Sequence, residues 1–128
     1  MTGHRTKMWG STTGLALTDK VQVELIRVRP TGFCSVHRHT FKDNLFLMIS
    51  GELTVRWGWS EDECLMTAAP NTEIMTPSSG AILIPKMVIH QFINESDSSA
   101  VAVELYRPSK GQNVEPQDIE RFSKGGVH

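Results

Sequence analysis

Three histidines in the interior of the sequence, His37, His39 and His90, carry its clearest chemistry. His37 and His39 are separated by one residue, and in an extended strand residues two apart point to the same face. Two adjacent imidazoles can begin a transition-metal site, and a third from another strand gives a three-nitrogen set with open positions for substrate. The sequence therefore predicts one divalent metal here, with zinc, manganese, iron and nickel all compatible.

Two alternatives stand beside this metal site. A His-x-His pair occurs on many solvated strands, and His90 alone would more often be a half-buried residue bonded to backbone. The remaining histidines, His4 and His128, lie near the chain ends, where ligands are rarely held in place. The combination of three interior histidines favours the metal site.

The segments that must position these histidines have the pattern of an all-β protein. Short runs with alternating or β-branched residues are separated by turns, which is typical of a sandwich or barrel. We expect strands at 21–29, 33–39, 44–50, 53–59, 63–68, 72–76, 81–84, 88–93 and 100–106. The nearly all-apolar run at 44–50 predicts a strand that is covered on both faces. Inward positions of different barrel strands converge on one cavity, which can bring His90 beside His37 and His39.

The length of 128 residues fits one domain. We divide it into an N-terminal arm at 1–19, a barrel at about 20–107 and a C-terminal tail at 108–128. Residues 1–14 are expected to be loose except for Trp9-Gly10, which should pack. In the tail, Pro116 can begin a short helix that continues over 117–122.

Composition narrows the class of partner. Charged residues make up 21% of the chain and the formal net charge is -1, so nucleic acid is not expected. No apolar run approaches the ~20 residues of a membrane span, and the N-terminus lacks the apolar segment of a signal peptide, which favours the cytoplasm. Cys34 and Cys64 lie in apolar runs and are interpreted as core residues without a disulfide.

The two histidine segments resemble the two motifs of the cupin family. The first motif is occupied by Gly32, His37, His39, Asn44 and Gly51, and the second by Gly80, Pro85, Met87, His90 and Asn94. The resemblance covers roughly residues 20–107. It implies a cupin-type double-stranded β-helix (jelly-roll) barrel, here with a short C-terminal helix, and a metal held by the motif histidines.

Two departures from the cupin pattern bear on the site. Asn44 stands where the family has a glutamate ligand, and an amide is a weaker ligand, so the resemblance implies three histidines alone or with Asn44 or water. Asp43 could substitute only if the loop at 41–43 extended past it, because within a strand neighbouring residues point to opposite faces. Met87 replaces a glycine of the second motif, so the loop before His90 is expected to adopt another conformation.

A weaker resemblance, to the cupin domain of type II mannose-6-phosphate isomerase, covers more of the chain. It rests on Trp9-Gly10-Ser11, Ser50-Gly51, Val103-Glu104 and the tail 115–122. That family mixes glutamine, histidine and glutamate in its metal shell, and His37, His39 and Asn44 occupy those positions here. The resemblance suggests a sugar-related ancestry.

These observations favour a metal-dependent isomerase or epimerase acting on a sugar or sugar phosphate. Such a reaction needs a Lewis acid and a base. Glu104 and Tyr106 are the candidate catalytic residues, with Glu24 a further candidate base, and Arg27 or Arg29 could hold a phosphate. The alternative for each is an ordinary place on the solvated face of a sheet.

Two other functions remain open from the sequence. One is a three-histidine iron dioxygenase, and the other is a non-catalytic protein that binds a small sugar. Trp57, Trp59 and Phe92 are more typical of core or interface packing than of a sugar platform. Apolar outer strands favour a homodimer.

Overall fold

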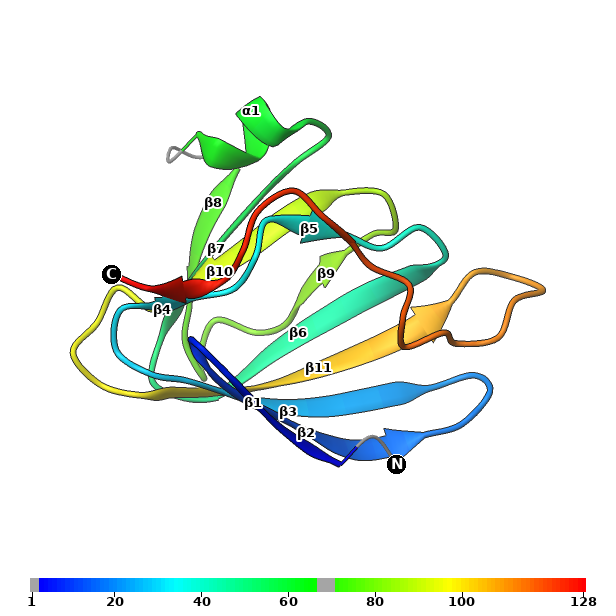
Figure 1. Cartoon of the computed structure of the whole chain (residues 1–128), viewed down its shortest axis with the longest axis horizontal. Coiled ribbons are helices and arrows are strands. Elements are labelled where there is room, and N and C mark those ends of the chain that lie inside the picture. Colours follow the sequence, from blue (N-terminus) through cyan, green and yellow to red (C-terminus); the bar gives the residue numbers. More distant parts are fainter. Residues whose placement is uncertain (1–2, 67–70) are drawn as a thin grey trace.

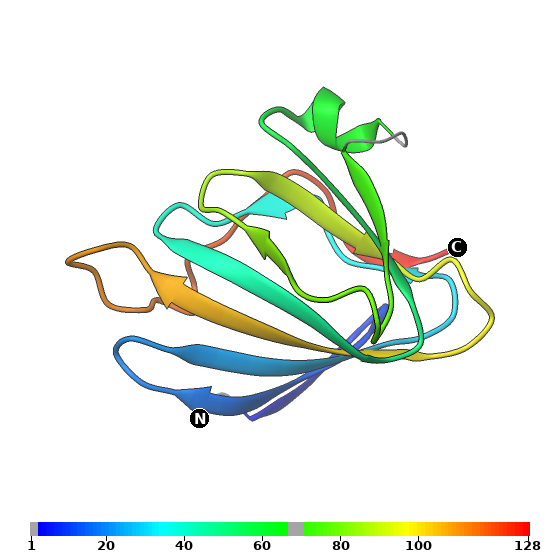
Figure 2. The ribbon, with the colours of Figure 1, turned by 180° about the vertical axis from the view of Figure 1, so that it is seen from behind.

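The computed structural model describes residues 3–66 and 71–128, which form two antiparallel sheets facing each other (Figure 1; Figure 2). The first sheet has the order β1-β2-β3-β11-β6-β9. Its strands are β1 (His4–Lys7), β2 (Gly10–Leu17), β3 (Gln22–Val28), β11 (Ala100–Pro108), β6 (Lys42–Ser50) and β9 (Ile82–Ile84). The second sheet contains β12 (Glu120–Arg121), β5 (His37–Arg38), β10 (Ile89–Ile93), β4 (Gly32–Phe33), β13 (Gly126–Val127), β7 (Leu53–Gly58) and β8 (Thr72–Met75).

The inward face of the first sheet changes from apolar to polar along the strands. At one end, Ile26, Ala102 and Met48 align across β3, β11 and β6 and join the main core. Toward the other end, Glu24 is paired in register with Glu104. The next row contains Gln22, Tyr106 and Asn44, all of them buried. The core therefore fills one end of the space between the sheets, and the other end is lined by groups that can do chemistry.

The N-terminal arm is more ordered than the sequence indicates. Residues 4–7 and 10–17 form β1 and β2, and β2 pairs with β3 along its length. Trp9 is buried, as predicted for Trp9-Gly10, and its ring contacts Phe92 edge-on at 5.0 Å. Gly10 has a φ of 154°, and a Cβ there would lie 1.8 Å from the carbonyl oxygen of Arg27, so only glycine allows this close approach.

Two other predicted elements are wrong. The turn at 60–62 and the following strand are replaced by the helix α1 (Glu61–Leu65), whose N-cap residue Ser60 accepts a hydrogen bond from the Glu63 amide. Residues 67–68 of that predicted strand lie outside the described residues. The predicted strand 33–39 is also divided into β4 and β5. The helix α1 forms because Ser60 is an N-cap residue followed by acidic residues in the first turn, which is a helix signal.

The predicted C-terminal helix at 117–122 is also absent. This segment forms turns and the short strand β12, which pairs with β5. In Figure 1 the red C-terminal segment crosses from the first sheet to the second. Its backbone is held by long-range bonds, including Val114 N to Asp19 O at 2.7 Å and Phe122 N to Val36 O at 2.8 Å. These contacts outweigh a short local helix, which is marginal by itself.

No helix within residues 3–66 and 71–128 is long and apolar enough to cross a membrane.

Candidate metal centre and its cavity

The sheet register brings the three interior histidines together. His90 on β10 lies directly opposite His37 on β5, and His39 follows β5. The ring centroids of His37 and His90 are 4.3 Å apart, and His39 lies 5.1 Å from His37 and 5.4 Å from His90. One ligand nitrogen from each ring lies within 4.8 Å of the other two. All three side chains are buried, so the structure forms the cluster predicted from the sequence.

The hydrogen bonds of the three imidazoles leave one nitrogen of each for a ligand. The Nδ1 atoms of His37, His39 and His90 bond the backbone oxygens of Ser35 at 2.7 Å, Asp118 at 2.7 Å and Val88 at 3.0 Å. The Nε2 atoms of His39 and His90 are buried and make no hydrogen bond with any described residue. Backbone carbonyls that bind Nδ1 fix the ring orientation and tautomer of metal-ligating histidines.

The electrostatics also fit a cation. Burial, followed by the neighbouring His90 and His39, lowers the pKa of His37 well below its ordinary value. Burial and His90 lower the pKa of His39 to about 3, and burial lowers that of His90 to about 4. The rings are therefore neutral near pH 7, which is the form that binds metal. Three neutral imidazoles with two orphaned nitrogens suit a first-row divalent metal.

The depressed imidazole pKa values predict how the metal-free protein responds to acid. In the unfolded chain histidine has a pKa of about 6.5, so below that pH the unfolded state binds protons that the folded site refuses. The free energy of unfolding is therefore not reduced by these three imidazoles above about pH 6.5. As the pH falls from there toward the pKa values that the imidazoles have in the folded protein, the free energy of unfolding decreases by about 1.4 kcal/mol per pH unit for each imidazole.

Urea unfolding of the chelator-treated protein at pH 7 and pH 5.5 measures this loss. A His37→Gln/His90→Gln variant provides the control and should show a shallower pH dependence. Equal slopes for the two proteins would contradict the assignment of the effect to these rings.

Asp118 ties the C-terminal segment to the metal centre. Its carboxylate accepts hydrogen bonds from the backbone amides of Thr40 at 3.0 Å and Phe41 at 2.8 Å, while its carbonyl accepts from His39 Nδ1. The side chain therefore fixes the carbonyl that orients one imidazole. The sequence predicted a short helix in this tail and gave no sign of a role for Asp118.

Replacing Asp118 with alanine should weaken zinc binding by about tenfold, the lower end of the range for residues that orient ligands. The carbonyl remains in this variant, but nothing then holds it against His39. Competition with a chromophoric chelator measures the affinity. Glu120→Ala is the matched control, because Glu120 lies in the same segment and its half-exposed side chain pairs with Arg38, not with the backbone after His39. Unchanged affinity in Asp118→Ala would exclude the positioning role.

Glu104, Asn44 and Tyr106 form a buried polar group on the first sheet. The carboxylate oxygen Oε2 of Glu104 accepts hydrogen bonds from Tyr106 Oη at 2.6 Å and Asn44 Nδ2 at 2.7 Å. No hydrogen bond from a described residue reaches the other oxygen, Oε1. Burial raises the pKa of Glu104, while its two bonds oppose the rise. Burial and Glu104 raise the pKa of Tyr106 well above its usual value.

Asn44 is one of the two donors to the Glu104 carboxylate. Its amide donates to Glu104, and its Oδ1 is buried and makes no hydrogen bond with any described residue. Tyr106, which is paired in register with Asn44, packs its ring edge-on against His39 at 5.1 Å. Asn44 is thus fully buried with one oxygen available, and its role as a metal ligand stays a prediction.

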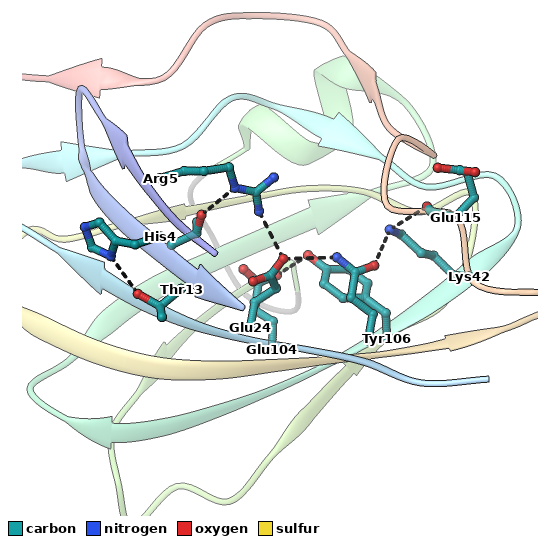
Figure 3. A network of polar contacts seen from close by, with 10 residues as sticks. His4, Arg5, Thr13, Glu24, Lys42, Glu104, Tyr106 and Glu115 are labelled. Carbon is teal, nitrogen blue, oxygen red and sulfur yellow. Dashed lines mark hydrogen bonds and ion pairs between the residues drawn. The ribbon is translucent and has the colours of Figure 1, made fainter. Parts of the chain in front are cut away.

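A second chain of polar contacts holds Glu24 and Lys42 beside this group (Figure 3). Arg5 pairs with Glu24 at 3.0 Å, and Gln22 bonds both Glu24 at 3.2 Å and Lys42 at 3.0 Å. The Lys42 amine also donates to the backbone oxygen of Glu115 and lies 4.3 Å from the Tyr106 ring centroid. Lys42 was missed because the predicted strand began only at residue 44, whereas β6 begins at Lys42 and turns it inward.

The remaining candidate residues separate into inward and outward positions. Glu24 is inward and buried, whereas Arg27 and Arg29 are exposed and outside the cavity, so the predicted role of these arginines in holding a phosphate is wrong. Asp43 bonds Arg107 and the Lys86 amide, as the opposite-face argument predicts. Met87 has a φ of 72°, so it keeps a left-handed conformation, and the expected change of loop conformation is wrong.

The tryptophans, Phe92 and the two cysteines have mainly structural roles. Phe92 is buried in the core and Trp57 packs against it, but Trp59 lies beyond the end of β7 and is 68% exposed. Cys34 and Cys64 are buried free thiols, as predicted. Burial raises the pKa of Cys64 to about 11, which keeps this thiol protonated and unreactive near neutral pH.

One cavity of about 370 Å³ joins the metal centre and the buried polar group. His37 and His39 line it from the second sheet, and Glu104, Tyr106, Glu24 and Lys42 line it from the first. This volume is within the range of small-molecule sites. A metal ion held by the histidines and the Glu104 carboxylate would therefore reach the same small ligand from opposite walls.

Comparisons with known proteins identify the fold. The sequence model described as mannose-6-phosphate isomerase C-terminal matches residues 2–124. No curated protein matches the sequence. The capsular polysaccharide assembling protein CapF from Staphylococcus aureus has a TM-score of 0.74 at 19% identity, and the match covers 94% of this chain and 34% of CapF. The chain thus spans about a third of that protein.

Two shorter proteins are similar over most of their length. BH2720 from Bacillus halodurans has a TM-score of 0.67 at 20% identity, with 97% of this chain and 80% of that chain covered. An uncharacterised protein from Klebsiella pneumoniae with a double-stranded β-helix domain has a TM-score of 0.65 at 12% identity, with 96% and 82% covered. These similarities establish the predicted double-stranded β-helix fold.

Proposed function

Since the chain belongs to the mannose-6-phosphate isomerase C-terminal family of cupin domains, we propose that it catalyses metal-dependent proton transfer on a small sugar or sugar phosphate. The reaction is of the isomerase or epimerase type. The observation that carries the proposal is the position of Glu104, which lines the same cavity as His37 and His39 and whose Oε1 accepts no hydrogen bond from residues 3–66 or 71–128.

The division of roles follows from the two walls of the cavity. His37, His39 and His90 would hold the divalent metal, which when bound supplies a Lewis acid for a substrate carbonyl or hydroxyl. Glu104 Oε1 takes the proton from the carbon next to the carbonyl. The same carboxyl group returns the proton to the neighbouring carbon, while the hydroxyl proton passes between the two oxygens, which completes an isomerisation; an epimerisation would need a second acid on the opposite face of the substrate.

Tyr106 and Asn44 hold the Glu104 carboxylate in position through its other oxygen. Both donate to Oε2, so the charged form of Glu104 is stabilised while Oε1 stays available. Fixing a base in this way supplies part of the catalytic advantage of a preorganised site. This arrangement supports proton abstraction more directly than it supports simple binding of a sugar.

Deuterium incorporation from heavy water tests the proposal. Zinc- or manganese-loaded protein incubated with mannose 6-phosphate is expected to exchange the hydrogen next to the carbonyl carbon, detected by NMR. Chelator-treated protein should show no exchange above background, and added metal should restore it. Exchange that persists without metal would contradict the proposed role of the histidines. Oxygen consumption by iron-loaded protein without exchange would favour the alternative dioxygenase.

We further propose that the outer face of the first sheet pairs with a second copy of this chain. The outward side chains of β6 and β9 are aliphatic and strongly exposed: Leu45, Leu47, Ile49 and Leu83. The prediction that β6 is covered on both faces is therefore not met within one chain. The neighbouring outward positions on β11 and β3 are also aliphatic and half-buried: Val101, Val103, Leu105, Val23 and Leu25. This aliphatic face is bordered by Arg27 and by the Asp43–Arg107 ion pair, and an apolar face of this kind can complement itself, as in two-fold homodimers.

Light scattering during size-exclusion chromatography should give twice the 14.3 kDa chain mass. Leu47→Lys should give a monomer, because it places a charge at the centre of the paired faces. Trp59→Lys is the control, since Trp59 is exposed away from this sheet. A monomeric wild-type protein at every concentration tested would disprove the dimer.

A further inference from the structure

Three cations line the cavity beside the metal centre. Lys7 ends β1, Arg121 lies on β12, and Lys124 precedes the glycine pair at 125–126, and all three line the cavity. In register, Arg121 is directly opposite His37 on the neighbouring strand. The cations therefore border the same space as the metal ligands but come from the two ends of the chain.

The two terminal segments that carry these cations are packed against each other. A Cβ added at Gly125 would lie 2.6 Å from Trp9 Cδ1, so the segment beside Lys124 runs directly over Trp9. Trp9 is buried two residues after Lys7 and is fixed by its contact with Phe92. Lys7 and Lys124 are thus held on one side of the cavity by ordered backbone.

The two carboxylates that line the cavity, Glu24 and Glu104, are bonded to residues other than these three cations. Among residues 3–66 and 71–128, no carboxylate forms an ion pair with Lys7, Arg121 or Lys124. Glu24 is paired with Arg5, and Glu104 is bonded by Tyr106 and Asn44. The pKa of Lys7 is lowered by burial and then by Arg5 and Arg121, while Glu24 opposes the fall to a smaller extent, so positive charge outweighs negative charge around Lys7. Bringing like charges together has a cost that a bound anion would remove.

We infer that Lys7, Arg121 and Lys124 bind an anionic group of the substrate, a phosphate or a carboxylate, while its reacting carbon lies between the metal centre and Glu104. This inference rests on the proposed function and adds that the substrate carries a negatively charged group, which binds at these three residues. Lysine and arginine are suited to this role because their hydrogen bonds to oxyanions are charge-assisted.

Binding measured without turnover tests the inference. In calorimetric titrations of the metal-loaded protein, mannose 6-phosphate, glucuronate or both should bind at least about tenfold more tightly than mannose, since charge-assisted hydrogen bonds are worth this much. Tighter binding of mannose 6-phosphate would identify the anionic group as a phosphate, and tighter binding of glucuronate would identify it as a carboxylate. The variant Lys7→Gln/Arg121→Gln/Lys124→Gln should lose the preference and still bind metal.

The matched control removes the same charge elsewhere. Arg27→Gln/Arg29→Gln/Lys110→Gln changes three exposed cations outside the cavity and should keep the preference. The inference is overturned if neither anionic sugar binds more tightly than mannose, if the cavity variant keeps the preference, or if the control loses it equally. These outcomes are independent of deuterium exchange, so failure of the anion site is distinguishable from failure of the proposed reaction.

Discussion

Replacement of His90 with alanine is expected to reduce zinc affinity by more than about a hundredfold. Changes that only disturb the orientation of a ligand already cost 10- to 100-fold, and this change removes a ligand. The remaining His37 and His39 would offer only two nitrogens, too few to complete a closed or catalytic zinc site. Competition with a chromophoric chelator measures the affinity.

The control for this prediction is His4→Ala. His4 lies on the edge strand β1, bonds Thr13 and takes no part in the histidine cluster, so its loss should leave metal affinity unchanged. Circular dichroism would show whether His90→Ala stays folded. A folded His90→Ala protein that still binds zinc with wild-type affinity would disprove the three-histidine centre.

Glu104→Gln is expected to slow deuterium exchange by about 10²- to 10⁴-fold, the usual contribution of a general acid or base. Glutamine keeps the shape of the side chain and an oxygen that can accept from Tyr106 or Asn44. It cannot take up a proton from carbon. The substitution should therefore lower kcat strongly while metal affinity stays within about twofold, well short of the loss caused by misorienting a ligand.

Two further variants separate chemistry from structure at this position. Glu73→Gln alters an exposed carboxylate on β8 and should leave exchange unchanged. Tyr106→Phe removes one of the two bonds to Oε2 but keeps the ring against His39, so we expect a smaller loss than in Glu104→Gln. Wild-type exchange in Glu104→Gln would show that another group is the base.

The metal cluster could be predicted from the sequence because its geometry is local. His37 and His39 share a face through the two-residue period of a strand, and only one other interior histidine was available to join them. The register of β10 against β5 then sets His90 opposite His37. The inward direction of Glu104 could not be decided, because alternation along β11 defines two faces without saying which of them faces the core.

The tail shows the limit of local patterns. Pro116 and the residues after it have helix signals, but Asp118 instead caps the backbone after His39, and β12 pairs with β5. The prediction of a loose N-terminal arm is wrong for the same reason, since β1 and β2 depend on the edge of β3, which is distant in sequence. Both segments bring charges to the cavity that no short motif could place there.

Metal content and coordination test the central claim most directly. The protein purified from metal-supplemented medium should contain about one divalent metal ion per chain, and X-ray absorption at the metal edge should show imidazole nitrogen ligands from three histidines. Far less than one ion per chain after supplementation, or a metal bound without imidazole ligands, would contradict the metal centre at His37, His39 and His90 and the proton-transfer reaction proposed from it.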